Sequence, residues 1–309
     1  MKYTYLTFLI LILNVVGLSA QNDVFFSQNY ANNSTLNPAF VGSSDQLLFT
    51  GGIREQWVGI EGSPNYSMAN VSMPFSLFNL NQGVGFSVVR DAFGFNKNIS
   101  FSGSYAAHFN ISGAGTLGFG LGFGFVNNSF SPSFIADNDG DSKIPLDNTF
   151  SNAVFDLSFG VYYKTDNMYF GLSGANLLAH DLSGVQNSSK ASRLFHLSAG
   201  YEVGISDTKW VAMPSVFVST NVINASMNLT CNFEYNKILW LGVNYKVADA
   251  ISAIAGVVLL KDIRIGYAYD FNTSKLRKAN GGSHELMVRY QFDLRKEKNP
   301  SSYRSVRYL

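Results

Sequence analysis

The sequence is dominated by short segments in which large apolar side chains alternate with polar or small ones. Residues 116–125 (TLGFGLGFGF) show the strictest form, with an apolar residue next to glycine at every second position. Period-two alternation is typical of an extended strand whose two faces lie in different environments. The same alternation, mostly with polar residues in place of glycine, recurs in residues 99–110, 154–163, 225–235 and 284–292.

Ten segments, the strictly alternating one at 116–126 and nine with weaker alternation, are added to these four, which brings the expected number of strands to fourteen. The ten segments lie near residues 47–56, 65–75, 83–91, 116–126, 167–176, 193–203, 209–220, 237–246, 250–259 and 262–271. Two of them, residues 209–220 and 250–259, alternate poorly, so totals of twelve and sixteen stay open.

Repeated alternating segments of about ten residues are typical of transmembrane β-barrels, which also have an even number of strands and long connections on the outer side. The longest gaps here, residues 127–152, 177–192 and 272–283, all join an odd-numbered strand to an even-numbered one. We therefore predict an all-β fold, a transmembrane outer-membrane β-barrel of about fourteen antiparallel strands. A soluble β-sandwich also alternates, but it would normally carry more surface charge.

The first twenty residues predict a secretory signal peptide that is cleaved after Ala20. Lys2 supplies its positive charge, and the apolar stretch is shorter than the roughly 20 residues that span a bilayer. The predicted organisation is a signal peptide over residues 1–20, a periplasmic or lumen segment over 21–46, the barrel over 47–294 and a basic tail over 295–309. Both termini of the mature chain are expected in the periplasm.

Composition supports a membrane location. Charged residues make up 14% of the chain and aromatic residues 15%, whereas ordinary soluble domains are roughly 25% charged. Without Lys2 the basic and acidic residues balance, which argues against a nucleic-acid partner. The single cysteine, Cys231, excludes an internal disulfide framework. The bilayer is thus the first expected partner, with Trp210 and Trp240 in an interfacial aromatic girdle.

If the large side chains of residues 116–125 face lipid, the glycines between them face the lumen. Neighbouring strands are also small on that side, and together they predict a nearly bare lumen wall. Its residues are Gly83, Gly85, Ser102, Ser104, Gly118, Gly120, Gly122, Gly124 and Gly160. Glycine in a strand often marks close approach of another backbone. We hypothesise that a polypeptide packs there, either the N-terminal segment or a partner chain; relief of barrel curvature is the alternative.

The region after the signal peptide carries several short motifs. They are Phe26-Ser27-Gln28, Leu36-Asn37-Pro38-Ala39 with Gly42, and Arg54, Gln56-Trp57 and Gly59. With FDLSFGVYYKTDNMYFGLS at 155–173 and GGSHELMVRYQFDL at 281–294, they resemble the PorP/SprF family of outer-membrane proteins from the type IX secretion system of Bacteroidetes.

This resemblance implies a non-enzymatic accessory that helps to export or retain a secreted cargo protein with a C-terminal sorting domain, including gliding-motility adhesins. It also implies contact with the type IX translocon or with periplasmic components. The basic tail over 295–309 is a docking peptide for such machinery or a frayed terminus. A passive outer-membrane porin for small solutes is the alternative function.

Other chemistry is weakly indicated. Asp137, Asp139 and Asp141 alternate in a predicted outer loop, where carboxylates can converge on Ca²⁺. The calcium-loop pattern fails at Ser142 and Asn148, and a solvated polar turn explains the residues better, so we predict no metal and no cofactor. His108 and His196 share the lumen face with many serines, but no nucleophile-elbow motif occurs. We therefore predict that the protein is not an enzyme.

Overall fold

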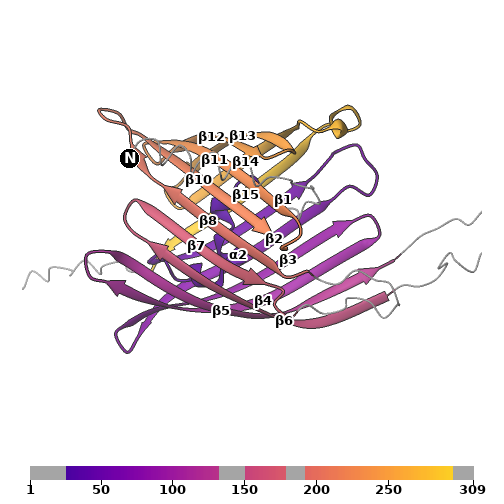
Figure 1. Cartoon of the computed structure of the whole chain (residues 1–309). Coiled ribbons are helices and arrows are strands. Elements are labelled where there is room, and N and C mark those ends of the chain that lie inside the picture. The colour runs from indigo at the N-terminus through magenta and orange to yellow at the C-terminus, as the bar shows by residue number, and fades with distance from the viewer. Residues whose placement is uncertain (1–25, 132–149, 179–191, 295–309) are drawn as a thin grey trace, which may run out of the picture.

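The computed structural model describes residues 26–131, 150–178 and 192–294, which form a closed β-barrel (Figure 1). Strands adjacent in the chain pair antiparallel with one another. The barrel closes where the last strand pairs with the first, from Gln46 opposite Asp293 to Glu55 opposite His284. The prediction of an all-β antiparallel barrel is confirmed.

The strands follow the alternating segments of the sequence. Their bounds are β1 (Gln46–Glu55), β2 (Asn65–Leu77), β3 (Leu80–Phe93), β4 (Asn96–Ile111), β5 (Gly115–Phe130), β6 (Phe150–Lys164), β7 (Met168–Ala175), β8 (Leu194–Tyr201), β9 (Val203–Gly204), β10 (Trp210–Thr220), β11 (Ala225–Tyr235), β12 (Leu239–Lys246), β13 (Ala250–Leu259), β14 (Ile263–Asn272) and β15 (Ser283–Asp293). Because β8 and β9 pair with β10 in one continuous register, they count as a single strand, and the barrel has 14 strands.

Side chains alternate between the lumen and the outer face, as the period-two pattern predicts. In β12, Asn244 and Lys246 are buried in the lumen, whereas Leu241 and Val243 are 53% and 57% exposed on the outer face. An apolar outer face suits the hydrocarbon region of a bilayer. In the part of the chain that the structure describes, no helix is long and apolar enough to cross a membrane.

The connections distinguish two ends of the barrel. One end, here called the turn end, carries short turns at residues 78–79, 112–114, 165–167, 205–209, 236–238 and 260–262. The chain enters β1 and leaves β15 at this end. The opposite end, here called the loop end, carries residues 56–64 and 273–282 and the connections that follow β5 and β7. The predicted long connections therefore share one end.

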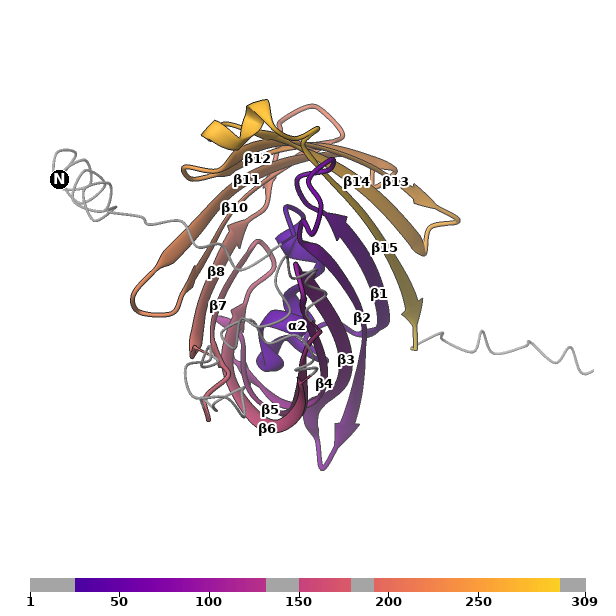
Figure 2. The same ribbon diagram turned by 90° about the vertical axis from the view of Figure 1, so that its right-hand side faces the viewer.

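Residues 26–45, here called the lumen segment, lie inside the ring of strands (Figure 2). They contain three short helical turns, η1 (Asn29–Ala31), α2 (Asn33–Leu36) and η2 (Pro38–Phe40). The segment begins beside the last pairs of β14 and β15 at the loop end and reaches β1 at the turn end. It thus runs along the lumen from one end to the other.

This path bears on the predicted positions of the termini. Phe26 lies in the half of the lumen nearest the loop end, whereas Leu294 lies at the turn end. The first and last described residues therefore lie toward opposite ends of the barrel. From the sequence we expected both termini on the same side. Residues 1–25, with the predicted signal peptide, and the tail over 295–309 lie outside the described residues, so their placement stays a prediction.

The predicted aromatic girdle is wrong for Trp240 and stays a prediction for Trp210. Trp210 contacts Tyr235 with ring centroids 5.0 Å apart, and that tyrosine is on the exposed outer face. Trp240 instead points into the lumen, where it is 2% exposed and packs on Ile254. Its even position in β12, shared with the lumen residue Asn244, already indicates this orientation.

Candidate functional site

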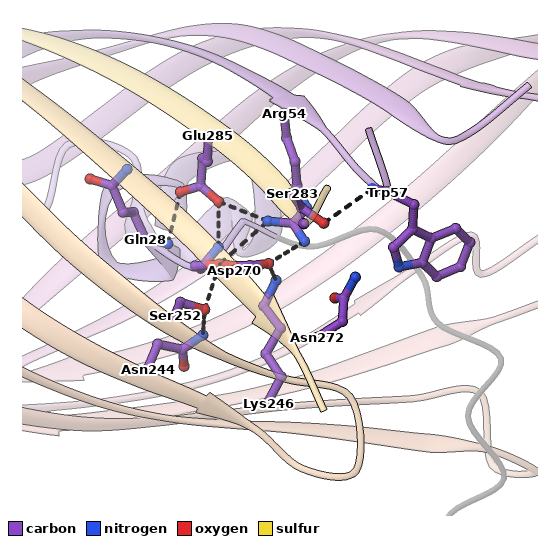
Figure 3. Close-up of polar contacts among 12 residues, drawn as sticks. Gln28, Arg54, Trp57, Asn244, Lys246, Ser252, Asp270, Asn272, Ser283 and Glu285 are labelled. Atoms are coloured by element: carbon purple, nitrogen blue, oxygen red, sulfur yellow. Dashed lines mark hydrogen bonds and ion pairs between the residues drawn. The ribbon is translucent and has the colours of Figure 1, made fainter. Parts of the chain in front are cut away.

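A cluster of buried charged side chains lies in the lumen near the loop end (Figure 3). This charge cluster consists of Arg54 of β1, Lys246 of β12, Asp270 of β14 and Glu285 of β15. Arg54 Nη2 lies 2.5 Å from Asp270 Oδ2, and Arg54 Nη1 lies 3.3 Å from Glu285 Oε2. Lys246 Nζ lies 2.9 Å from Asp270 Oδ2. The two cations balance the two carboxylates, as buried charges require.

The lumen segment supplies further hydrogen bonds to this cluster. The backbone N–H of Ser27 donates to Glu285 Oε2 at 2.6 Å, and that of Gln28 donates to Glu285 Oε1 at 3.0 Å. The Ser27 hydroxyl donates to Asp270 Oδ1 at 2.8 Å. Hydrogen bonds to charged acceptors are the stronger kind. The segment is therefore held at its beginning by two carboxylates from neighbouring strands.

Phe26 adds an apolar contact beside the charges. It is fully buried against Met68 and Met287, and its ring meets Tyr66 edge-on with centroids 5.1 Å apart. Gly52 leaves room for this ring, because a Cβ at that position would lie 2.9 Å from Phe26 Cζ. The Phe26-Ser27-Gln28 motif thus meets the barrel through an apolar contact of the Phe26 ring and three hydrogen bonds to carboxylates.

The connection after β1 continues from the charge cluster to the loop end. The Trp57 N–H donates to Ser283 Oγ at 3.2 Å (Figure 3). The Val58 N–H donates to Gly282 O at 2.9 Å, and the Gly281 N–H donates to Val58 O at 2.8 Å. Two loop-end connections are therefore tied together. Trp57 has a φ of 52°, a conformation that costs a non-glycine residue roughly 1–3 kcal/mol.

The predicted glycine wall, formed by the nine residues named above, contacts the second half of the lumen segment. A Cβ at Gly120 would lie 2.2 Å from Ala39 N, and a Cβ at Gly83 would lie 2.2 Å from Val41 O. Real Cβ atoms do not approach backbone so closely. Only glycine at these strand positions allows the segment to lie against β3 and β5.

Other members of the wall differ in their contacts. Added Cβ atoms at three of them would also meet the lumen segment within 4 Å, namely Gly85 at Val41, Gly118 at Ala39 and Gly122 at Pro38. Gly124 does not belong to this contact, since its nearest atoms come from Phe101 and Ser102 of β4. Ser104 likewise lies beside Gly122. Of the two polypeptides considered for the wall, the N-terminal segment and a partner chain, it is the lumen segment that contacts most of the wall residues in this structure.

Asn37 is the polar centre of this contact. Its Nδ2 donates to Val161 O at 3.0 Å and to Leu172 O at 3.3 Å, and its Oδ1 accepts the Ala39 N–H at 2.9 Å. The last of these bonds caps η2, which Pro38 begins. Gly160 makes room, because a Cβ there would lie 2.0 Å from Asn37 Oδ1. The Asn37-Pro38-Ala39 motif therefore fits a site made by β5, β6 and β7.

The wall contact ends toward the turn end with two more polar contacts. His108 Nε2 lies 2.8 Å from Val41 O, and the Gly42 N–H donates to Ser72 Oγ at 3.0 Å. Gly42 has a φ of +72°, which favours glycine. His108, considered above as a candidate catalytic residue, here holds the backbone of the lumen segment.

The remaining candidate residues are dispersed. His196 Nδ1 lies 3.1 Å from Ser219 Oγ, where the two residues face each other across β8 and β10. The carboxylate of Asp156 instead accepts hydrogen bonds from the backbone N–H groups of Asn176 and Leu178. Within the described ranges, no group of three His, Cys, Asp or Glu is placed to hold a metal ion. Asp137, Asp139 and Asp141 lie outside those ranges, so their calcium hypothesis stays untested.

Comparison with known proteins is informative about family and fold. A family model described as type IX secretion system membrane protein PorP/SprF matches residues 18–290. The structure is similar to the Ralstonia pickettii toluene transporter TbuX, with 10% identity, 84% of this chain and 92% of that chain covered, and a TM-score of 0.51. It is also similar to a Pseudomonas aeruginosa FadL homologue, with 11% identity, coverages of 85% and 94%, and a TM-score of 0.50. At these identities the likeness shows the barrel fold alone. Comparison with curated proteins gives no match.

Proposed function

The chain belongs to the PorP/SprF family of type IX secretion system membrane proteins, and from this membership we propose that it binds a secreted cargo protein and helps to export or retain it. The cargo carries a C-terminal sorting domain, as in the gliding-motility and adhesin cargoes that the family resemblance implies. In this proposal the barrel performs no chemistry and acts by binding.

The observation that carries the proposal is the occupied lumen. The lumen segment contacts β14 and β15 at one end of its course and β3 to β7 at the other. Solute flow through the part of the lumen that this segment occupies requires the segment to leave its buried charge pairs and close backbone contacts. A binding role at the two ends of the barrel requires no such movement. The occupied lumen therefore favours an accessory over a passive porin.

We place the turn end in the periplasm and the loop end outside, in line with the usual asymmetry of bacterial barrels. The cargo then meets the loop end, and the surface around Trp57 is the described part of it that we favour. Hydrogen bonds of Val58 with Gly281 and Gly282 fix this surface, and Val58 is 37% exposed. Strained backbone of the Trp57 kind persists where the surrounding structure holds it, often at functional sites. The long connections over 127–152 and 177–192 are further candidates for the cargo-facing surface, and parts of them lie outside the described residues.

Affinity isolation of the tagged full-length protein from outer membranes of its native host tests the proposal. Mass spectrometry is expected to find a large secreted protein with a C-terminal sorting domain. Val58→Asp places a charge on the exposed surface and should reduce its recovery. Ile223→Asp alters an 88% exposed residue in another loop-end connection and is the matched control. Recovery of the barrel alone, together with open conductance in planar bilayers, would overturn the proposal in favour of a porin.

A further inference from the structure

A cavity of about 830 Å³ opens at the turn end of the barrel. Its lining includes Gly42 and Asp45 of the lumen segment, Thr116 of β5, Lys164 and Asp166 at the β6–β7 turn, and Leu294 after β15. We call this cavity the vestibule. Its volume lies within the roughly 300–1,000 Å³ of clefts that hold ligands. The vestibule is therefore large enough for several residues of an extended peptide.

The lining of the vestibule is polar. Asp45 and Asp166 bring two carboxylates to it and Lys164 brings one ammonium group, so that the lining carries one net negative charge. Asn110 and Thr116 add amide and hydroxyl groups at the β4–β5 turn. Such a surface suits a peptide that combines basic side chains with hydrogen-bonding groups.

The sequence supplies a peptide of this kind at the rim. Leu294 lines the vestibule, and the residues that follow it, RKEKNPSSYRSVRYL, contain five basic residues and one acidic residue. Six strand spacings separate β15 from β6, which is about 29 Å along the wall at about 4.8 Å each. Fifteen extended residues reach about 50 Å. Residues 295–309 can therefore reach every part of the lining.

We propose that residues 295–309 fold back into the vestibule of their own barrel, with basic side chains on Asp45 and Asp166. Docked in this way, the tail contacts the part of the lining that Gly42, Ser43 and Asp45 form. Because the attachment is intramolecular, the tail is present at a millimolar effective concentration, and weak individual contacts suffice to keep it bound. This inference is independent of the cargo proposed above.

Cysteine cross-linking of the full-length protein in liposomes tests the docking. In a Cys231→Ser background, Thr116→Cys in the vestibule is combined with Ser305→Cys in the tail. The matched control combines Asp207→Cys with the same tail cysteine, since Asp207 is an exposed residue of another turn at the same end. At low salt the vestibule pair should form its disulfide about tenfold faster than the control pair. Asp45→Asn with Asp166→Asn should remove most of this difference.

Equal cross-linking rates for the two pairs would overturn the proposal. A second measurement uses Ser43→Cys, also in the lining. Removal of residues 295–309 should increase its rate of maleimide labelling several-fold, and an unchanged rate would again contradict docking. In membranes of the native host, a tail cysteine that cross-links to another protein in place of the vestibule would assign the tail to a partner and overturn self-docking.

Discussion

A methyl group added at Gly120 tests whether glycine is needed for the lumen segment to lie on the wall. The Cβ of Gly120→Ala would lie 2.2 Å from Ala39 N and 2.3 Å from Pro38 C. Both atoms belong to the backbone, so no side-chain rotation can relieve the overlap. The segment or β5 must move by about 1 Å, and overpacking of this kind typically costs about 1–3 kcal/mol.

Gly51→Ala is the matched control for this substitution. Gly51 also lies inside a strand, but the nearest atom to its added Cβ is Met68 O at 3.9 Å. Both variants gain the roughly 0.5–1 kcal/mol that alanine contributes over glycine in a strand. Gly51 lies on the outer face with Phe49 and Ile53, so its added methyl group also gains up to about 0.8 kcal/mol from contact with lipid or detergent. The part of the difference between the two free energies of unfolding that exceeds this gain reports the overpacking.

Urea unfolding of the refolded barrel, followed by tryptophan fluorescence, measures this difference. With slopes of about 1–3 kcal/mol per molar urea, Gly120→Ala should unfold at roughly 1 M less urea than Gly51→Ala. A cost of 2 kcal/mol changes an equilibrium about 30-fold, so we also expect more frequent openings of Gly120→Ala in single-channel recordings. Coincident unfolding midpoints and equal conductance would refute the role assigned to Gly120.

Substitutions at three anchors of the lumen segment are tested by the same unfolding assay. Arg54→Met leaves two buried carboxylates with one cation and should lower the free energy of unfolding by about 3–5 kcal/mol. Adding Glu285→Gln restores the charge balance, and a double-mutant cycle should show that it recovers about 1–3 kcal/mol of this loss. Strictly additive costs would contradict this pairing. Asn37→Ala removes two hydrogen bonds to strand carbonyls and should cost about 1–3 kcal/mol, and a neutral effect would show that these bonds do not hold the segment. Phe26→Ala should cost about 3–5 kcal/mol, with Phe26→Leu recovering more than half; equal losses would exclude ring packing as the cause.

The strands could be predicted from the sequence because their physical signal is local. A strand between lipid and lumen must alternate, and the alternation in residues 225–235 matches β11 residue for residue. Even the poorly alternating residues 250–259 form β13, whose lumen face carries the small or apolar side chains of Ala250, Ser252 and Ile254. The helical turns of the lumen segment gave no such signal, since α2 contains only four residues.

The site could be predicted only in part, because some of its residues come from strands that are far apart in the sequence. The glycine wall could be recognised because its glycines share one parity within single strands. The charge cluster could not be recognised, because Arg54 and Asp270 are 216 positions apart in the sequence. Their meeting depends on the register of β1 with β15 and of β15 with β14, which turn lengths and closure determine together.

The seam between β1 and β15 has a consequence for the order of folding. Its partners are the most distant of all paired strands along the chain, and such pairings form late because loop closure costs entropy before contacts form. Residues 26–45 immediately precede β1, and threading them through a finished cylinder would be slow. We therefore expect them to settle on the inner surface of the open sheet first. Arg54 and Glu285 face each other across the seam, so the zipping that completes the cylinder also assembles the charges around Ser27.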